Sequence, residues 1–262
     1  MFKENSGRDQ KNRPGKKNPI YFYLLLVLIP ILFFVLLETG LRLFAYGTNN
    51  QQWVKVTEGK LMLNPDIARR YFFTTRNIPI SIQDVFDKTK KPNAFRVFIL
   101  GESSAAGYPY LPIGSFSRYL QKRLELLYPN SKAEVVNIGM TAVNSYALRD
   151  MFVGVLEQKP DLILIYSGHN EYYGALGIGS MESLGTNRAI VNLTLYLNKF
   201  KTVELLRNVI KAASELFSGK ENGKHDGTLM SRIAKDQFIN YDSEKFYKGL
   251  LQYESNMRDI LD

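Results

Sequence analysis

Apolar and polar residues divide the chain into one continuous apolar stretch near the N-terminus and a more regular, alternating pattern beyond residue 93. Residues Ile20 to Leu37 include no charged side chain. A helix of this length spans about 27 Å, close to the thickness of the hydrocarbon core of a bilayer. Tyr21, Phe22 and Tyr23 lie at one boundary, where aromatic rings favour the membrane interface. The pattern predicts a transmembrane helix over residues 20–37.

Basic residues are concentrated just before this helix, with six lysines and arginines against two acidic residues in 1–19. Basic flanks stay on the cytoplasmic side, so residues 1–19 are predicted to be a cytoplasmic tail and the rest of the chain extracytoplasmic. A cleaved signal peptide is the alternative. The apolar run is longer than the usual signal sequence, however, and no A-x-A site follows it. A buried core helix would not need a basic leader.

Three short apolar runs then alternate with helical patterns. Strands are expected over Arg96–Leu100, Glu134–Ile138 and Asp161–Tyr166, and helices over Ser115–Tyr128 and Asn144–Gln158. Strands that alternate with helices of this length favour right-handed crossovers and a parallel sheet covered on both faces. The predicted fold is therefore a three-layer α/β sandwich with a parallel sheet, preceded by one transmembrane helix.

The remaining segments have weaker patterns. Residues 38–92 are interpreted as a stalk or cap, with short strands considered at Val54–Val56, Tyr71–Phe73 and Ile78–Ile82. Residues 188–217 favour one or two amphipathic helices, and residues 243–261 favour another. Helices of the first kind usually cover a core. A lid that meets lipid is the alternative for residues 176–230.

Composition narrows the chemistry. The chain has no cysteine, which excludes disulfides, cysteine nucleophiles and thiolate metal sites. Its net charge of +9 comes partly from residues 1–19, so nucleic acid is not an expected partner. No metal or organic cofactor is predicted.

Each predicted strand ends in a polar loop that contains glycine. These loops are GESS at 101–104, GMT at 139–141 and SGHNE at 167–171. Ligands of parallel sheets bind at the carboxyl ends of the strands, so the three loops are expected to form one site.

The same loops resemble the SGNH/GDSL hydrolases. ILGESSAAG (99–107), NIGMTAVNS (137–145) and SGHNEYYG (167–174) resemble the first, second and third sequence blocks of that family. The resemblance implies a flavodoxin-like SGNH domain over residues 93–262, with Ser103 as the nucleophile. It also implies three oxyanion donors, namely the Ser103 amide, the Gly139 amide and the Asn170 side chain.

The expected chemistry explains these residue types. A serine hydroxyl needs a base to become a good nucleophile, and the tetrahedral oxyanion needs donors already aimed at it. Glycine lets a backbone N–H approach the substrate, and asparagine donates without carrying charge. Each residue also has a plainer interpretation, because Gly139 could be a turn glycine and Asn170 could cap a helix.

The sequence departs from the family pattern in three places. Glu102 and Glu171 replace aspartates, and Ser104 stands where the motif has leucine. Ser104 is a rival nucleophile, although the register of the motif favours Ser103.

The family's base comes from a D-x-x-H block, and this sequence has none. His169 occupies the variable position of G-x-N, and His225 lies in a loop rich in glycine and lysine. The expectation is therefore a hydrolase domain that is incomplete at its C-terminus.

These observations lead to two functional hypotheses. The first is a membrane-anchored, extracytoplasmic serine esterase or acyl-transferring enzyme that works through an acyl-Ser103 intermediate. Its substrate would carry an ester and could be an acylated carbohydrate of the cell envelope. The second is a non-catalytic, membrane-tethered binding or scaffold module on a degenerate SGNH fold.

Overall fold

The computed structural model describes residues 19–73, 78–79, 81–180, 183–184, 187–218 and 238–262. The chain divides into two compact units, residues 1–46 and residues 47–262, which are described separately. Of the predicted basic tail, only Pro19 lies within the described residues, and His225 lies outside them.

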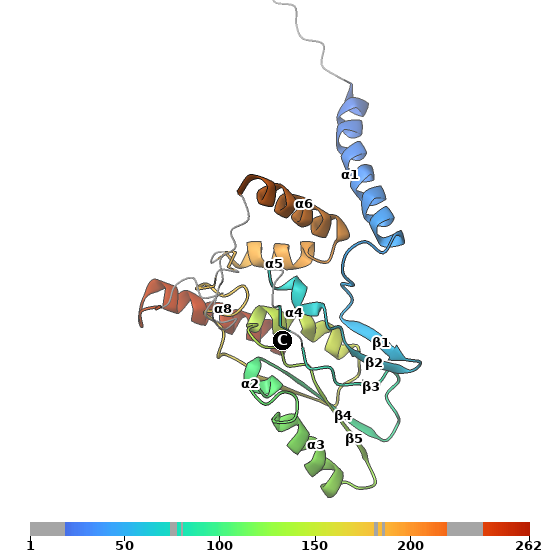
Figure 1. Cartoon of the computed structure of the whole chain (residues 1–262), viewed down its shortest axis with the longest axis vertical. Helices are drawn as coiled ribbons and strands as arrows, with labels where there is room; N and C mark the ends of the chain where they lie inside the picture. Colours follow the sequence, from blue (N-terminus) through green and yellow to red (C-terminus); the bar gives the residue numbers. More distant parts are fainter. Residues whose placement is uncertain (1–18, 74–77, 80, 181–182, 185–186, 219–237) are drawn as a thin grey trace, which may run out of the picture. The chain divides into compact units, whose positions relative to one another are not determined.

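The first unit contains helix α1 (Ile20–Leu43), which is long and apolar enough to span a membrane (Figure 1). The helix predicted over residues 20–37 is thus confirmed and extends to Leu43. Pro30 lies inside it and does not end it, as is common in helices suited to lipid. The apolar stretch ends where Arg42 pairs with Glu38, with 2.7 Å between Nε and Oε1.

Three parallel strands form the central sheet of the second unit. They are β4 (Ala94–Gly101), β5 (Lys132–Asn137) and β6 (Leu162–Tyr166), and they confirm the three predicted strands. β4 lies between the other two, in the order β5-β4-β6. The chain therefore leaves β4 toward one side and returns to the other, as in doubly wound sheets.

Alternating side chains of these strands face two different helices. On one face, Val97 and Ile99 pack with Leu120 and Leu124 of α3 (Phe116–Leu127). Ser115 caps this helix by accepting a hydrogen bond from the Ser117 N–H. This face forms the smaller of the two cores.

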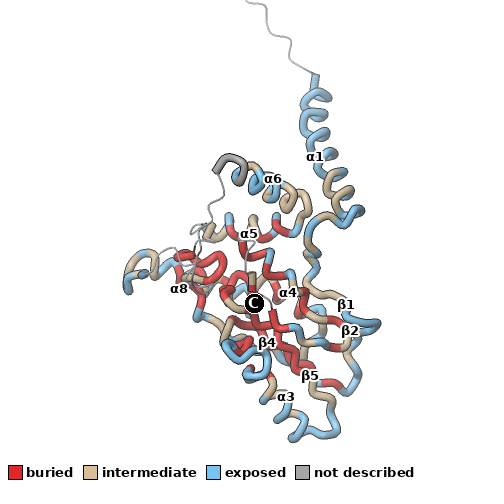
Figure 2. Tube along the Cα trace, viewed as in Figure 1, coloured by how far each residue is buried: buried red, intermediate tan, exposed pale blue. Residues whose placement is uncertain are grey.

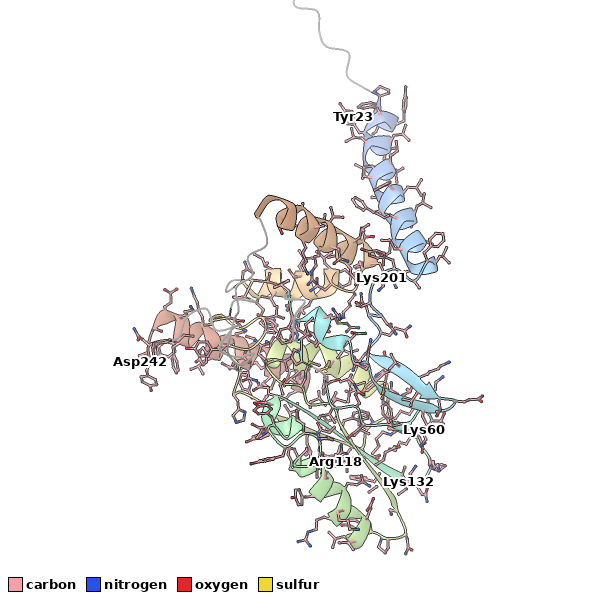
Figure 3. All side chains as sticks on the ribbon, viewed as in Figure 1. Tyr23, Lys60, Arg118, Lys132, Lys201 and Asp242 are labelled. Atoms are coloured by element: carbon pink, nitrogen blue, oxygen red, sulfur yellow. The ribbon has the colours of Figure 1, made fainter. Side chains whose placement is uncertain are left out.

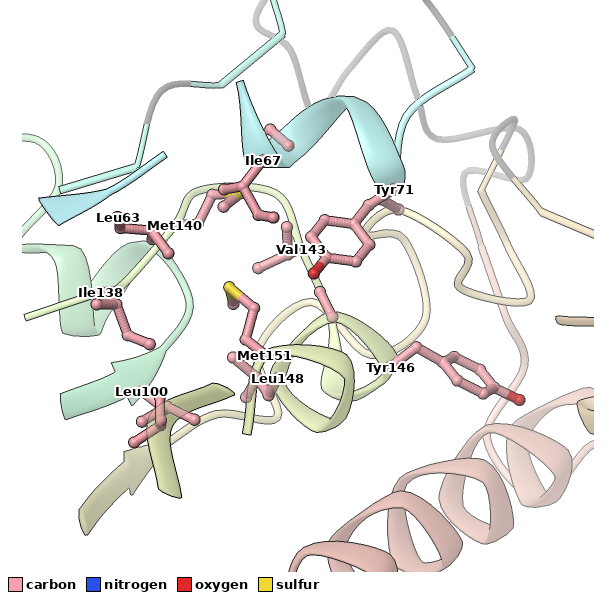
Figure 4. Packing of buried hydrophobic residues seen from close by; sticks show 14 of the residues in the cluster. Leu63, Ile67, Tyr71, Leu100, Ile138, Met140, Val143, Tyr146, Leu148 and Met151 are labelled. Atoms are coloured by element: carbon pink, nitrogen blue, oxygen red, sulfur yellow. The ribbon is translucent and has the colours of Figure 1, made fainter. Parts of the chain in front are cut away.

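On the other face, Leu100 and Ile138 pack with Leu148 and Met151 of α4 (Ser145–Leu156), as Figure 4 shows. Asn144 caps α4 by accepting from the Tyr146 N–H. The sheet is thus covered on both faces, and buried residues are concentrated around it (Figure 2). The result is a mixed α/β fold.

A second, antiparallel sheet is formed by β1 (Trp53–Thr57), β2 (Lys60–Leu63) and β3 (Phe86–Asp87), in that order. The expected strand at 54–56 lies within β1. No strand is present over 71–73 or over the described part of 78–82. Tyr71 and Phe72 instead follow a 3-10 helix, η1 (Ile67–Arg70). Both are buried in the core, which explains the apolar run that suggested a strand.

This antiparallel sheet and η1 pack onto the main domain. The rings of Trp53, Phe86 and Phe98 meet edge to face, with centroids 5.1 to 5.8 Å apart. Leu63 and Ile67 belong to the same core as α4 (Figure 4). Residues 47–92 therefore help to build the core of the second unit.

The C-terminal part is helical, as predicted for residues 188–217 and 243–261. It contains α5 (Arg188–Leu197), α6 (Lys201–Ser218) and α8 (Glu244–Leu261). α8 packs beside α4. Asn187 and Ser243 cap α5 and α8 by accepting backbone N–H groups.

Arg96 holds the amino-terminal ends of the parallel strands together. Its side chain is 1% exposed. Its Nε lies 2.7 Å from Glu134 Oε2, and its terminal nitrogens donate to the carbonyls of Gln158 and Asp87. Asp87 also pairs with Lys60 and Lys132, which Figure 3 labels. The cluster fastens β3 to β4 and β5.

We expect Arg96→Met to destabilise the domain by about 3–5 kcal/mol, because it leaves the Glu134 carboxylate and two carbonyls without their partner. Arg258→Met is the matched control, since the Arg258–Glu254 pair is exposed and worth about 0.5 kcal/mol or less. Urea unfolding followed by circular dichroism measures both. Equal losses in the two variants would contradict a special role for Arg96.

Candidate active site

The three predicted loops all follow parallel strands at their carboxyl ends. Ser103 follows β4, Gly139 follows β5, and Asn170 follows β6. β4 and β6 are neighbours in the sheet, although β5 lies between them along the chain. The crevice between β4 and β6 is therefore the topological switch point. Ligands of open parallel sheets bind at such points. Ser103 and Asn170 lie on its two sides.

Ser103 is the first residue of a short helix, α2 (Ser103–Ala106), directly after β4 (Figure 1). The Ala106 N–H donates to the Glu102 carbonyl, and the Tyr108 N–H donates to the Ser103 carbonyl at 2.9 Å. Ser103 and its rival Ser104 are both half-buried. Among the described residues, none forms a hydrogen bond with the Ser103 hydroxyl. The backbone around Ser103 is thus fixed while its side chain is left available.

Glu102 joins the first loop to the third. Its side chain is fully buried. One carboxylate oxygen accepts the Gly168 N–H at 2.9 Å, and the other accepts the Asn170 N–H at 2.8 Å. Burial raises the pKa of Glu102, and these two N–H donors oppose the rise. The carboxylate therefore sets the position of the backbone at Asn170 relative to Ser103.

The Asn170 side chain is buried with an unused donor. Asn170 is 7% exposed, and its Nδ2 has no hydrogen-bond partner among the described residues. A buried donor without an acceptor costs about 1–3 kcal/mol, so a fold seldom keeps one without reason. An incoming oxygen atom would satisfy it. This is the property that an oxyanion donor needs.

Gly139 has a different environment from the one predicted. Its N–H donates to the Asn137 side chain at 2.8 Å, so that group is already engaged. A Cβ at this position would come within 2.6 Å of the Ala106 nitrogen. The close approach that requires glycine is therefore to the backbone of α2. As an oxyanion donor, the Gly139 amide would first have to leave Asn137, and this role stays a prediction.

Sequence reasoning missed Ala142 in the same loop. Ala142 has a φ of +59°, an unusual value for a residue with a Cβ. Its carbonyl accepts the Ala175 N–H at 2.8 Å, and its own N–H makes no hydrogen bond to any described residue. A strained backbone with an unused donor beside Gly139 is a second candidate for this part of the site. An alanine carries no sequence signal for such a role.

Glu171 connects the site to the last helix. Its carboxylate accepts hydrogen bonds from the Ser145 N–H at 3.1 Å and the Ser145 hydroxyl at 2.7 Å, while Gln252 of α8 lies 3.4 Å away. Asn256, also in α8, donates to the Ser145 hydroxyl at 2.8 Å. Burial raises the pKa of Glu171 to about 7. Glu171 thus links the third loop to α4 and α8, a role that the motif comparison did not indicate.

Aromatic side chains border the third loop. The Tyr166 ring contacts Phe116 and His169 edge to face, with centroids 6.2 and 5.0 Å away. His169 Nδ1 lies 3.9 Å from Glu102 Oε2, which is too far for a hydrogen bond. The geometry identifies no base for Ser103 among the described residues. The part of the chain that the structure describes also contains no acidic or histidine cluster suited to a metal.

Comparisons with protein-family models, with curated proteins and with solved structures found no match to this chain. The site must therefore be interpreted from its own geometry.

We expect Gly139→Ala to destabilise the domain by about 1–3 kcal/mol, because the added methyl group overlaps the α2 backbone. Gly154→Ala in α4 is the control. There a Cβ would meet only the movable end of the Gln52 side chain, and alanine favours a helix. Thermal unfolding distinguishes the variants. A Gly139→Ala protein as stable as Gly154→Ala would contradict the tight packing.

Stability should fall as pH rises through neutrality. The pKa of Glu171 is higher in the folded state than in the unfolded chain, so its contribution is full below about pH 4.5 and is lost as pH rises through about 7. Over this pH range, the contribution of Glu171 to the free energy of unfolding falls by roughly 3 kcal/mol. Glu171→Gln should flatten the curve of unfolding free energy against pH between 5 and 8. A residual slope is expected from Glu102, and an unchanged slope would contradict the assignment.

Proposed function

We propose that this chain is a membrane-anchored serine hydrolase of the SGNH/GDSL type that acts on ester bonds through Ser103. The observation that carries the proposal is the buried Nδ2 of Asn170, which has no hydrogen-bond partner among the described residues. The backbone N–H of the same residue donates to Glu102, which holds the third loop to the start of α2. The parallel sheet with a β5-β4-β6 order supports it, because Ser103 and Asn170 flank the switch point of that sheet.

The reaction would follow the chemistry of acyl transfer. Ser103 Oγ would form a bond to the ester carbonyl carbon while a base takes its proton, and the resulting oxyanion would accept a hydrogen bond from Asn170 Nδ2. The bond to the alcohol oxygen would then break, and the alcohol would leave with that proton. Water or a sugar hydroxyl would release the acyl group from Ser103. We assign the base to no residue of this chain.

The location belongs to the same proposal. α1 would cross the membrane, with residues 1–19 in the cytoplasm and residues 47–262 outside it. Esters of the cell envelope, such as acylated carbohydrates, would be within reach of a domain tethered in this way.

A binding or scaffold module is the second candidate, and one observation favours it. The Gly139 N–H, expected to complete the oxyanion hole, is bonded to Asn137. A pocket that retains the Asn170 donor without a second donor and a base could hold an ester or carboxylate without cleaving it.

A serine-directed fluorophosphonate probe tests Ser103. We expect the full-length protein to be labelled, Ser103→Ala to lose labelling, and Ser104→Ala to retain it. Asn170→Ala should slow labelling by about 10²–10³-fold, because one oxyanion donor is removed. Equal labelling of the wild type and Ser103→Ala would refute Ser103 as the nucleophile. An unlabelled wild type would favour the binding module.

A further inference from the structure

Helix α6 presents its apolar side chains outward. Leu206, Val209 and Ile210 are each more than half exposed. Of the side chains described between 201 and 214, none is buried, and Figure 2 shows this helix without the buried colour of its neighbours. By contrast, α5 buries Val191 and Leu195 in the core. Amphipathic helices of globular domains normally turn the apolar face inward, so α6 is reversed.

Polar contacts hold α6 to the domain instead. Glu204 Oε1 accepts the Thr48 N–H at 2.8 Å and the Thr48 hydroxyl at 3.0 Å, and Lys201 donates to the Thr48 carbonyl. One turn later, Arg207 donates to the Phe72 carbonyl at 3.2 Å and lies over the Phe73 ring. Lys201, Glu204 and Arg207 recur at intervals of three residues, which defines one face of the helix. The apolar stripe of Leu206, Val209 and Ile210 is thereby left uncovered by the residues that the structure describes.

The covalent chain limits what can cover this stripe. α1 ends at Leu43, and Thr48, which binds the first turn of α6, is five residues further on. Five residues span at most about 18 Å. If α1 spans the bilayer, as proposed above, the chain keeps the first turn of α6 within reach of the bilayer surface.

We propose that α6 lies on the membrane surface, with Leu206, Val209 and Ile210 inserted into the lipid interface. Helices of this kind bury their apolar face roughly 5–10 Å into the boundary between headgroups and acyl chains. Together with α1, α6 would fix how the domain is oriented on the membrane.

Fluorescence quenching in lipid vesicles tests this inference. The chain has no cysteine, so one introduced cysteine can carry an environment-sensitive label at a chosen position. Val209→Cys reports on α6, Leu28→Cys on α1, and Lys122→Cys on the exposed surface of α3. Each labelled full-length protein is placed in phosphatidylcholine vesicles that contain a lipid with a quencher at a shallow depth, and iodide is used as the aqueous quencher.

We expect the label at 209 to lose more than half of its fluorescence to the lipid quencher and little to iodide, and the label at 122 to do the reverse. A label at 209 that behaves like the one at 122, or that is shielded from both quenchers as in a contact with a second copy, would overturn the inference. The label at 28 decides separately whether α1 is inserted. Labelling of Ser103 by the fluorophosphonate probe depends on neither result.

Discussion

The carboxylate of Glu102 is the group on which the candidate site depends. A fully buried charge is costly, and here two backbone N–H groups from the loop after β6 offset that cost. Both donors must stay within hydrogen-bond distance, so the loop that carries Asn170 is held against the start of α2. The position of the Asn170 side-chain amide, which has no partner among the described residues, relative to the start of α2 follows from this one requirement. The geometry of the candidate site is therefore set by Glu102, the residue before Ser103.

Buried polar clusters lie at both ends of the parallel strands, and they differ in kind. At the amino-terminal ends, the guanidinium of Arg96 has a partner for each of its three nitrogens. At the carboxyl ends, Asn170 Nδ2 lacks a partner among the described residues, and the pKa of Glu171 is raised to about 7 by burial. A satisfied network stabilises a fold, whereas a buried donor without a partner is free to bind a ligand. The contrast agrees with a candidate site at the carboxyl ends of the strands.

The sequence predicts the parallel strands and the helices α3 and α4 that cover them. Their apolar residues recur over a few neighbouring positions, so the pattern can be recognised locally. It also predicts helices that begin at Ser115 and Asn144, and in the structure these two residues cap α3 and α4. It does not predict that Tyr71 follows a 3-10 helix, because a buried position favours an apolar residue whatever the backbone conformation. Nor does it indicate that the Asn137 side chain occupies the Gly139 N–H, or that α8 reaches Glu171. These contacts join residues whose side chains meet only after the sheet and its helices have assembled.

The bonds of Glu102 also affect the order in which the domain can form. Its donors, Gly168 and Asn170, lie 66 and 68 residues further along the chain. At about 5–20 residues per second, synthesis reaches them only several seconds after Glu102 has been made. Until then this carboxylate must remain hydrated, so the end of β4 cannot be sealed from water. The loop around Ser103 therefore cannot become rigid before β6 and the loop that follows it have been made.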